Sequence, residues 1–211
     1  MAIAHRAASA LFVVALPILL ITTNVRFAGT ETRLWEWGFD RYDAEGTTGI
    51  DRPELDRAAD QIAAYFTNDE PYLRIKVEDD GRLQPLFNQR ETAHMADVKD
   101  LFGLTFAVQA VALAYVLSYV VGVFVWEQAS PLGVLARQVL LSLAVLAGAV
   151  IVIGGIALVG FDAAWEQFHI IGFDNDLWQL DPDTDHLIQM FPEDFFFDMT
   201  LLVGGLTLLE A

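Results

Sequence analysis

Cysteine is absent from this chain of 211 residues, and lysine occurs only twice. Without cysteine there are no disulfide bonds, no thiolate metal ligands and no thiol nucleophile. Basic residues are also scarce, with 12 Lys and Arg against 29 Asp and Glu, whereas a nucleic-acid-binding protein needs a basic surface. These absences exclude thiol chemistry and nucleic-acid binding before any motif is considered.

The sequence is both very apolar and very acidic. Hydrophobic residues make up 55% of it, yet the formal net charge is −17. The two properties occupy different parts of the chain, because residues 26–100 and 162–194 hold nearly all of the charged side chains. This segregation is typical of a membrane protein with acidic loops, and it excludes a soluble enzyme and a disordered acidic chain.

Four apolar runs predict membrane-spanning helices over residues 7–25, 101–126, 139–161 and 195–211. A run of about 20 apolar residues is long enough to cross the hydrocarbon core of a bilayer. The first run is not followed by the A-x-A pattern of a cleaved signal peptide, so we expect it to be retained. The last run is the weakest of the four, because it is short and contains Asp198.

Four spans would place the two acidic segments, 26–100 and 162–194, on the same side of the membrane. Lys and Arg in short segments next to a span favour the cytoplasmic side. Arg6 and Arg137 lie in such segments, whereas residues 162–194 contain no basic residue. We therefore expect a multi-pass protein of the cell membrane, with both termini cytoplasmic and both acidic loops extracellular.

The first acidic loop has the signals of a small folded layer. Apolar residues recur at helical spacing after Asp51, which predicts an amphipathic helix over 53–66 with Asp51 as its N-cap. Residues 72–77 alternate as a strand does, and residues 79–81 predict a turn after it. Residues 28–50 show no clear pattern. The predicted fold is a mainly α membrane protein, in which four transmembrane helices are topped by a small α+β extracytoplasmic layer.

Two histidines lie close to the predicted outer membrane surface. His94 stands seven residues before Leu101 and His169 eight residues after Phe161, so both should lie at a similar depth. On a helix, Arg90 and Asp97 share one face with His94, and Asp97 is close enough to orient the ring and favour the imidazolium. Histidine exchanges protons near neutral pH, as acyl transfer requires. A capped polar helix with an incidental histidine explains the same pattern.

The segment after His169 admits several interpretations. Its aromatic side chains are typical of an interfacial belt, formed here by Trp165, Phe168, Phe173 and Trp178. Asp181, Asp183 and Asp185 imitate the start of a calcium-binding loop, but His186 and Pro192 stand where that loop needs glycine and glutamate. We expect instead that Asp181 or Asp183 caps a short helix over 184–191, which Pro192 ends.

A zinc site is a further alternative, with His94, His169 and either Glu91 or Asp97 as ligands. The sequence lacks the HExxH, GxSxG and glycine-rich phosphate-loop patterns that mark other catalytic classes.

The segments around the two histidines resemble those of a known family of integral membrane proteins. The similar motifs are ETAHMADVK at 91–99, FH at 168–169, and NDLW followed by LDP.TD.LI.MFPE.FF across 175–196. The family that they resemble is DUF1461, whose characterised bacterial member, a lipoprotein intramolecular transacylase, moves an acyl chain from a diacylglyceryl-cysteine to the α-amino group of that cysteine. The resemblance implies that His94 and His169 are catalytic, that no cofactor or metal is required, and that a lipoprotein or lipid in the membrane is the substrate.

The roles within the pair can be stated as a hypothesis. We expect His169 to be the base and His94, held by Asp97, to be the acid or oxyanion donor, with the reverse assignment as the alternative. Arg90, Asn88 and Glu91 are supporting residues. Competing hypotheses are a non-catalytic family member that binds lipid or lipoprotein, and a metal-dependent hydrolase.

The acidic loops also suggest the source of the protein. Carboxylates with few lysines are typical of halophilic proteins, because multimolar salt screens the repulsion between carboxylates. If the source is a haloarchaeon, its ether-linked lipids offer no acyl group to transfer. The ester would then have to come from elsewhere, or the protein would carry out another reaction or a binding function.

Overall fold

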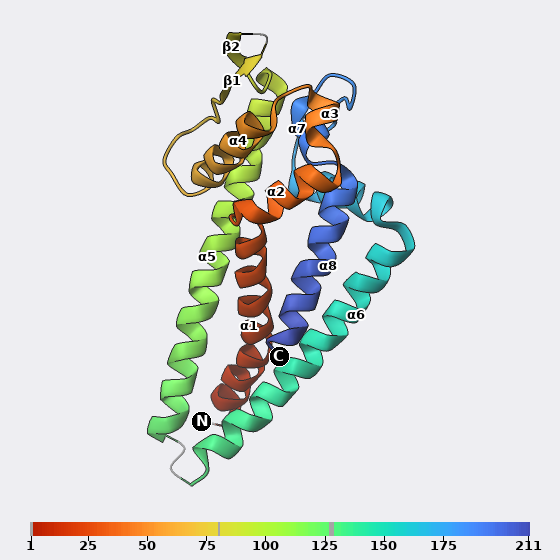
Figure 1. The fold of residues 1–211 in the computed structure, drawn as a ribbon. Helices are drawn as coiled ribbons and strands as arrows, with labels where there is room; N and C mark the ends of the chain where they lie inside the picture. Colours follow the sequence, from red (N-terminus) through yellow and green to blue (C-terminus); the bar gives the residue numbers. More distant parts are fainter. Residues whose placement is uncertain (1, 80, 127–128) are drawn as a thin grey trace. The chain divides into compact units, whose positions relative to one another are not determined.

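The computed structural model describes residues 2–79, 81–126 and 129–211, and it is mainly helical (Figure 1). In chain order the elements are α1 (Ala2–Ala28), α2 (Thr32–Arg41), α3 (Ala44–Thr48), α4 (Arg52–Tyr65), β1 (Lys76–Asp79), β2 (Arg82–Pro85), α5 (Gln89–Trp126), α6 (Pro131–Gly172), α7 (His186–Met190) and α8 (Glu193–Leu209). The chain divides into two compact units. Unit 1 comprises Met1–Arg26, Leu104–Leu158 and Leu201–Ala211, and unit 2 comprises Phe27–Gly103 and Val159–Thr200.

Among the described residues, three helices are long and apolar enough to cross a membrane, namely α1 from His5 onwards, α5 and α6. They contain three of the four predicted spans. Helix α5 has 38 residues and is therefore about 57 Å long, almost twice the thickness of a hydrocarbon core. All of its charged residues lie within residues 89–100, so the apolar remainder, 101–126, stays the predicted span. In α6 the uncharged residues 139–161 are followed by Asp162 and Glu166, and the same argument applies.

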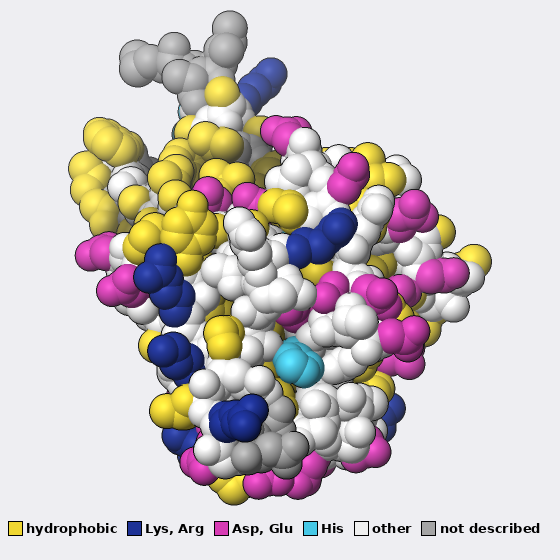
Figure 2. All heavy atoms as spheres, turned by 90° about the horizontal axis from the view of Figure 1, so that it is seen from above, with side chains coloured by type: hydrophobic (Ala, Val, Ile, Leu, Met, Phe, Trp, Pro, Cys, Tyr) yellow, Lys and Arg dark blue, Asp and Glu magenta, His cyan; other side chains and the backbone are white. Residues whose placement is uncertain are grey.

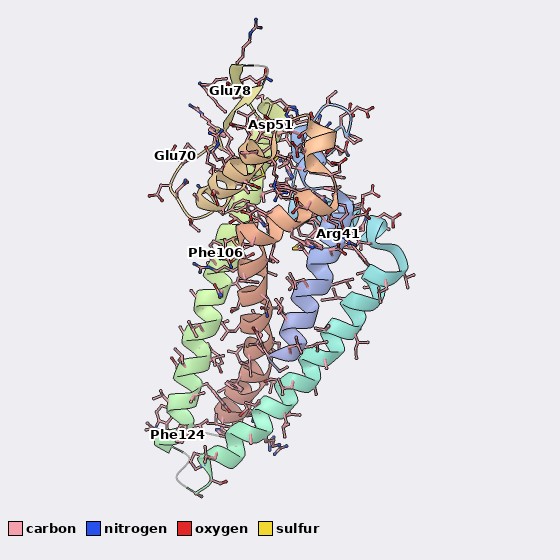
Figure 3. All side chains as sticks on the ribbon, in the orientation of Figure 1. Arg41, Asp51, Glu70, Glu78, Phe106 and Phe124 are labelled. Carbon is pink, nitrogen blue, oxygen red and sulfur yellow. The ribbon has the colours of Figure 1, made fainter. Side chains whose placement is uncertain are left out.

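Unit 1 contains a small apolar cluster around Phe12, Tyr119 and Val123. The rings of Phe12 and Tyr119 stack with their centroids 4.5 Å apart. Many other large apolar side chains of this unit are exposed, such as Phe124, which projects from α5 in Figure 3. A soluble protein rarely exposes so much apolar surface, whereas lipid covers such a surface at no cost.

Unit 2 has a hydrophobic core of its own, to which α2, α4, β1, α5, α7 and α8 all contribute side chains. Helix α4 confirms the predicted amphipathic helix, because Leu55, Ala58, Ala59 and Ile62 are all buried in this core. Asp51 is the N-cap residue, as predicted, although its side chain makes no capping hydrogen bond. This core fixes the N-terminal end of α5, on which one of the candidate catalytic histidines lies.

Residues 28–50 form two helices that the sequence pattern did not predict. Helix α2 is anchored by Trp35, whose indole N–H donates to the carbonyl of Ala28 at 3.0 Å. Helix α3 begins after Asp43, which takes the left-handed conformation with φ 51° and accepts a hydrogen bond from the N–H of Gly46. Such short elements depend on tertiary contacts rather than on periodicity.

The predicted strand is displaced along the chain. Strand β1 begins at Lys76 rather than at residue 72. Lys76 pairs with Pro85, the last residue of β2, and the N–H of Leu86 donates to the carbonyl of Ile75. The alternation is nevertheless real, since Leu73, Ile75 and Val77 are buried. Of the predicted turn 79–81, Gly81 has a φ of +74°, and Asp80 lies outside the described residues.

Helix α8 covers the predicted fourth span but, with 17 residues, is not one of the three candidate spans. Its acidic residue Asp198 is paired within unit 2. The hydroxyl of Tyr42 donates to Asp198 at 2.6 Å, and the guanidinium of Arg41 lies 2.8 Å from the same carboxylate. Figure 3 labels Arg41 at the end of α2, beside α8. The charge in this apolar run is therefore neutralised by a contact near the start of the helix.

Figure 2 shows Asp and Glu side chains at many separate places on the face that it draws, among apolar side chains and several Lys and Arg side chains. This distribution agrees with the acidic composition of the two loop segments.

Candidate functional site

The structure brings His94 and His169 together inside unit 2. His94 lies on α5 and His169 near the end of α6, and their ring centroids are 6.1 Å apart. Only 6% of His94 and 7% of His169 is exposed. The backbone of Gly160 departs from helical geometry, so His169 belongs to the short helical segment that follows this kink. Two imidazoles from distant parts of the chain thus form a buried pair.

The hydrogen bond of His169 identifies its neutral tautomer. Its Nδ1 lies 2.8 Å from the carbonyl oxygen of Trp165, one turn earlier in the same helix. A carbonyl oxygen only accepts, so Nδ1 must carry the proton and donate it. Burial lowers the pKa of His169, and this backbone bond opposes the change. A neutral ring with a proton on Nδ1 has its lone pair on Nε2, which is the arrangement of a general base.

His94 is neutral as well, contrary to the imidazolium expected from the sequence. Burial and, second, the neighbouring His169 lower the pKa of His94 to about 4, while the carboxylate of Asp97 has a weaker, opposing effect. Its Nδ1 is buried and has no hydrogen-bond partner among the described residues. The ring also meets Phe173 edge to face, with the centroids 5.1 Å apart. Near neutral pH this ring is therefore uncharged and has one unsatisfied nitrogen.

Asn88 and Glu91 form a capping box at the start of α5. The side chain of Asn88 accepts hydrogen bonds from the N–H groups of Arg90 at 2.8 Å and Glu91 at 3.0 Å, and Glu91 accepts one from the N–H of Asn88 at 2.7 Å. Glu91 is 1% exposed and also accepts from the N–H of Leu187 at 2.6 Å. Burial raises the pKa of Glu91, and its two backbone donors oppose this. These residues stabilise the helix end and dock α7 against it.

Arg90 and Asp97 hold the loop that follows α6, and Asp97 does not hold His94 as expected. The guanidinium of Arg90 donates to the carbonyl oxygens of Asp176 and Leu177. Asp97 accepts from the side-chain amide of Asn175 at 2.9 Å, and no hydrogen bond joins it to His94 in the described part of the chain. The helix face predicted from the spacing exists, but its two charged members bind the loop.

The aspartates after this loop bind backbone and side-chain amide groups. Asp185, not Asp181 or Asp183, is the N-cap residue of α7, which is shorter than the predicted helix 184–191. The carboxylate of Asp185 accepts from the side chain of Asn88 and from the N–H of Asp181. Within residues 2–79, 81–126 and 129–211, no group of three or more His, Asp and Glu side chains is arranged to hold a metal ion.

Two polar residues, Asn175 and Asp185, were not predicted to be partners of the side chains at the start of α5. Both contact residues about 80 to 100 positions earlier in the chain, so no local spacing could reveal the pairs. Their one signal was their position inside the segment that resembled a known family.

Comparison with known proteins identifies this arrangement. Residues 10–196 match the family model described as lipoprotein intramolecular transacylase Lit. The chain belongs to the Lit family. A protein of Aquifex aeolicus described as uncharacterized is 28% identical over 210 residues, which cover 95% of this chain and 88% of that protein.

Solved structures share the fold of this Lit family member. The structure of the membrane integral lipoprotein intramolecular transacylase Lit from Bacillus cereus matches with a TM-score of 0.83 at 16% identity, over 99% of this chain and 91% of that one. Two structures of variants of the same protein, each with a histidine replaced, match with TM-scores of 0.75 and 0.71. The chain is therefore a mainly helical membrane protein with the fold of Lit.

Proposed function

We propose that this protein is an acyltransferase that moves an acyl chain within a lipidated lipoprotein, from the diacylglyceryl group of the terminal cysteine to the α-amino group of that cysteine. Membership of the Lit family gives the reaction class. The observation that carries the proposal is the buried pair of neutral imidazoles, His94 and His169, with ring centroids 6.1 Å apart.

The reaction balances without a cofactor or an external reactant. The α-amino nitrogen attacks the carbonyl carbon of the ester, a carbon–nitrogen bond forms, and the ester carbon–oxygen bond breaks. The nitrogen loses one proton and the released glyceryl oxygen gains one. With a pKa of about 8, the α-amino group is partly unprotonated at neutral pH. The site must therefore orient the neutral amine, remove the proton that its nitrogen loses as the amide forms, and stabilise the oxyanion.

His169 is the general base in this proposal, because its lone pair is on Nε2 while Nδ1 is held by Trp165. His94 acts on the oxygen side of the reaction. Its Nδ1 has no partner within the described residues, so a substrate group or a shift of the ring is needed to satisfy it. His94 then stabilises the developing oxyanion or delivers the proton to the glyceryl oxygen. Arg90, Asn88, Glu91 and Asp97 support the site by holding the helix end and the loop.

The proposed topology has four spans, over residues 7–25, 101–126, 139–161 and 195–211, with both termini cytoplasmic and both acidic loops outside the cell. The absence of cysteine makes a direct test simple. Thr184 and Ser130 are exposed and lie in opposite connections of this topology. A cysteine at Thr184 should react with a membrane-impermeant thiol reagent in intact cells, and one at Ser130 only after permeabilisation. The reverse pattern would refute the orientation.

The activity is tested with purified protein and a synthetic diacylglyceryl lipopeptide in detergent. Transfer within one molecule leaves its mass unchanged, so tandem mass spectrometry must locate the acyl chain on nitrogen or on glycerol. We expect N-acylated product from the wild type, and a rate about 100- to 10,000-fold lower from His169→Ala, as for the loss of a general base. His94→Ala should also be strongly impaired.

His5→Gln is the matched histidine control, because His5 is exposed near the start of α1. A lipopeptide with an ether-linked chain at the same position is the substrate control and should remain unchanged. Transfer at the wild-type rate by both His94→Ala and His169→Ala would refute the mechanism. Binding of the lipopeptide without any transfer would favour the non-catalytic alternative.

A further inference from the structure

Four aromatic side chains surround His169, the residues that the sequence had suggested as an interfacial belt. Their ring centroids lie 4.5 to 5.5 Å from that of His169, and they belong to Trp165, Phe168, Phe173 and Trp178. Trp165 and Phe168 meet the imidazole nearly perpendicularly, at 84° and 81°. The imidazole is thus enclosed by rings from its own helical segment and from the loop that follows.

Of the four rings, that of Trp178 lies most nearly parallel to the imidazole, and Phe173 is more tilted, at 37°. The ring centroid of Trp178 is 4.9 Å from that of His169, and the two planes make an angle of 28°. The face of an indole carries negative electrostatic potential, and a cation within about 6 Å of the ring centroid is attracted to it. A neutral imidazole gains only packing from this contact, whereas an imidazolium gains a cation–π interaction.

A base in this position meets an electrostatic problem. When His169 takes a proton from the amine, it becomes a cation in a place where only 7% of the residue is exposed. No described carboxylate lies within ion-pair distance of its ring, in the parts of the chain where side chains are described. Besides His94, whose ring centroid is 6.1 Å away, the aromatic faces are therefore the groups that interact with the charge.

Two side chains of α5, those of Arg90 and Asp97, hold the loop residues that precede Trp178. Asn175, Asp176 and Leu177 immediately precede it, and each of them is held by a hydrogen bond. The side chain of Asn175 donates to Asp97 at 2.9 Å and accepts from the N–H of Leu177 at 2.9 Å. The guanidinium of Arg90 binds the carbonyl oxygens of Asp176 and Leu177.

We propose that Trp178 is a positioning residue that stabilises the imidazolium form of His169 through its π face, and that Arg90 and Asp97 hold the loop that places it there. This inference rests on the proposed function for its catalytic meaning, but the interaction itself is a property of the resting protein. It gives Arg90 and Asp97 a role that their place beside His94 in the sequence did not suggest.

The direct test is the pKa of His169, measured by NMR on 15N-histidine-labelled protein in detergent, with the signal assigned from a His169→Gln sample. Trp178→Leu keeps an apolar cover but removes the π face, so the pKa should fall by about 0.5 to 1 pH unit. Trp178→Phe should lie between the two proteins, because Phe is the weaker cation–π partner and is the variant that best preserves packing. Trp37→Leu makes the same substitution elsewhere in unit 2 and should leave the pKa unchanged.

A role in excluding water predicts the opposite sign. If Trp178 only covers the ring, its loss lets in solvent, and the pKa of His169 rises towards its ordinary value. A rise, or no change, in both Trp178 variants would overturn the inference. The other titratable and charged groups on the surrounding elements are the same in wild type and Trp178 variants, namely His94, Arg90 and Asp97 on α5, Glu166 on α6, and Asp174 and Asp176 in the loop.

Asp97 offers a matched pair of variants for the loop. Asp97→Asn and Asp97→Leu both remove the negative charge, but only Asn keeps an oxygen that accepts from Asn175. The pKa of His169 should therefore be lower in Asp97→Leu than in Asp97→Asn. Equal values would show that the loop contact does not act through Trp178.

Activity separates this inference from the proposed function. In Trp178→Leu the acid limb of the rate profile should move to lower pH together with the NMR pKa, because the base must be unprotonated to act. If His169→Ala transfers acyl groups at the wild-type rate, the proposed function is wrong whatever the NMR shows. If His169 is essential but its pKa does not respond to Trp178, the proposed function stands and the inference fails.

Discussion

His94 should make the protein lose stability as the pH falls below neutrality. The residue is 6% exposed, and its pKa is lowered from 6.5 to about 4, first by burial and second by His169. Between these two pH values the unfolded chain binds a proton that the folded protein does not bind, so the free energy of unfolding falls with falling pH. Above the unfolded pKa neither state is protonated, and below the folded pKa both are. A difference of about 2.5 pH units corresponds to about 3 kcal/mol, lost in full near the lower value.

The comparison that isolates this effect is between the wild type and His94→Gln, whose side chain does not titrate. The free energy of unfolding in detergent is measured for both proteins from neutral pH down to about pH 4. Groups that do not interact with His94 contribute equally in both proteins, so their contributions cancel in the difference. The wild type should lose about 3 kcal/mol relative to His94→Gln over this range.

A difference that stays constant with pH would refute the reasoning, because it would mean that His94 has the same pKa in the folded and unfolded chains. A difference of the opposite sign would mean that Asp97 stabilises the imidazolium, as the spacing of the two residues on α5 first suggested. The experiment therefore decides between burial and the nearby carboxylate as the dominant influence on the ring.

Two further variants test the packing of unit 2. Glu91→Ala removes the acceptor of the N–H groups of Asn88 and Leu187 and should lower the free energy of unfolding by about 2 to 4 kcal/mol, measured by chemical unfolding in detergent; a loss below about 0.5 kcal/mol would mean that water replaces both bonds. Gly38→Ala places a methyl group 2.6 Å from the ring of Phe195, which is 3% exposed, and overpacking should cost about 1 to 3 kcal/mol. An unchanged melting temperature in Gly38→Ala would show that the Phe195 ring can move aside.

Local patterns in the sequence predicted the helices that the spacing of apolar residues or the length of an apolar run determines. The helix 53–66 followed from apolar side chains at helical spacing, and the structure places that face in the core of unit 2. The helix considered around His94, on which Arg90 and Asp97 share one face with it, is the start of α5. Three of the apolar runs lie on helices that are long and apolar enough to cross a membrane.

What the sequence could not predict depends on contacts between distant residues. The two helices within residues 28–50 are too short for periodicity to show them, and they are stabilised by the core that they join. The burial of His94 depends on contacts between distant residues, which the sequence does not reveal. The carboxylate of Asp97, one turn away, was therefore expected to determine the charge of the ring, whereas desolvation has the larger effect on its pKa. Asp97 binds Asn175 rather than His94 for the same reason, because a partner 78 positions away in the chain competes with a neighbour on the helix.

The candidate site residues at the start of α5 and just before it divide into two groups by their hydrogen bonds. Asn88, Arg90, Glu91 and Asp97 are bonded to backbone or side-chain groups of the loop or of the helix end, so folding alone accounts for their presence. His94 is the exception, because its Nδ1 is the one buried side-chain nitrogen or oxygen without a partner in the described part of the chain. Leaving such a group unpaired costs about 1 to 3 kcal/mol, and nothing in the fold of unit 2 requires it. A substitution to an apolar residue would remove that cost, so the presence of an imidazole facing a second imidazole is better explained by the proposed reaction than by stability.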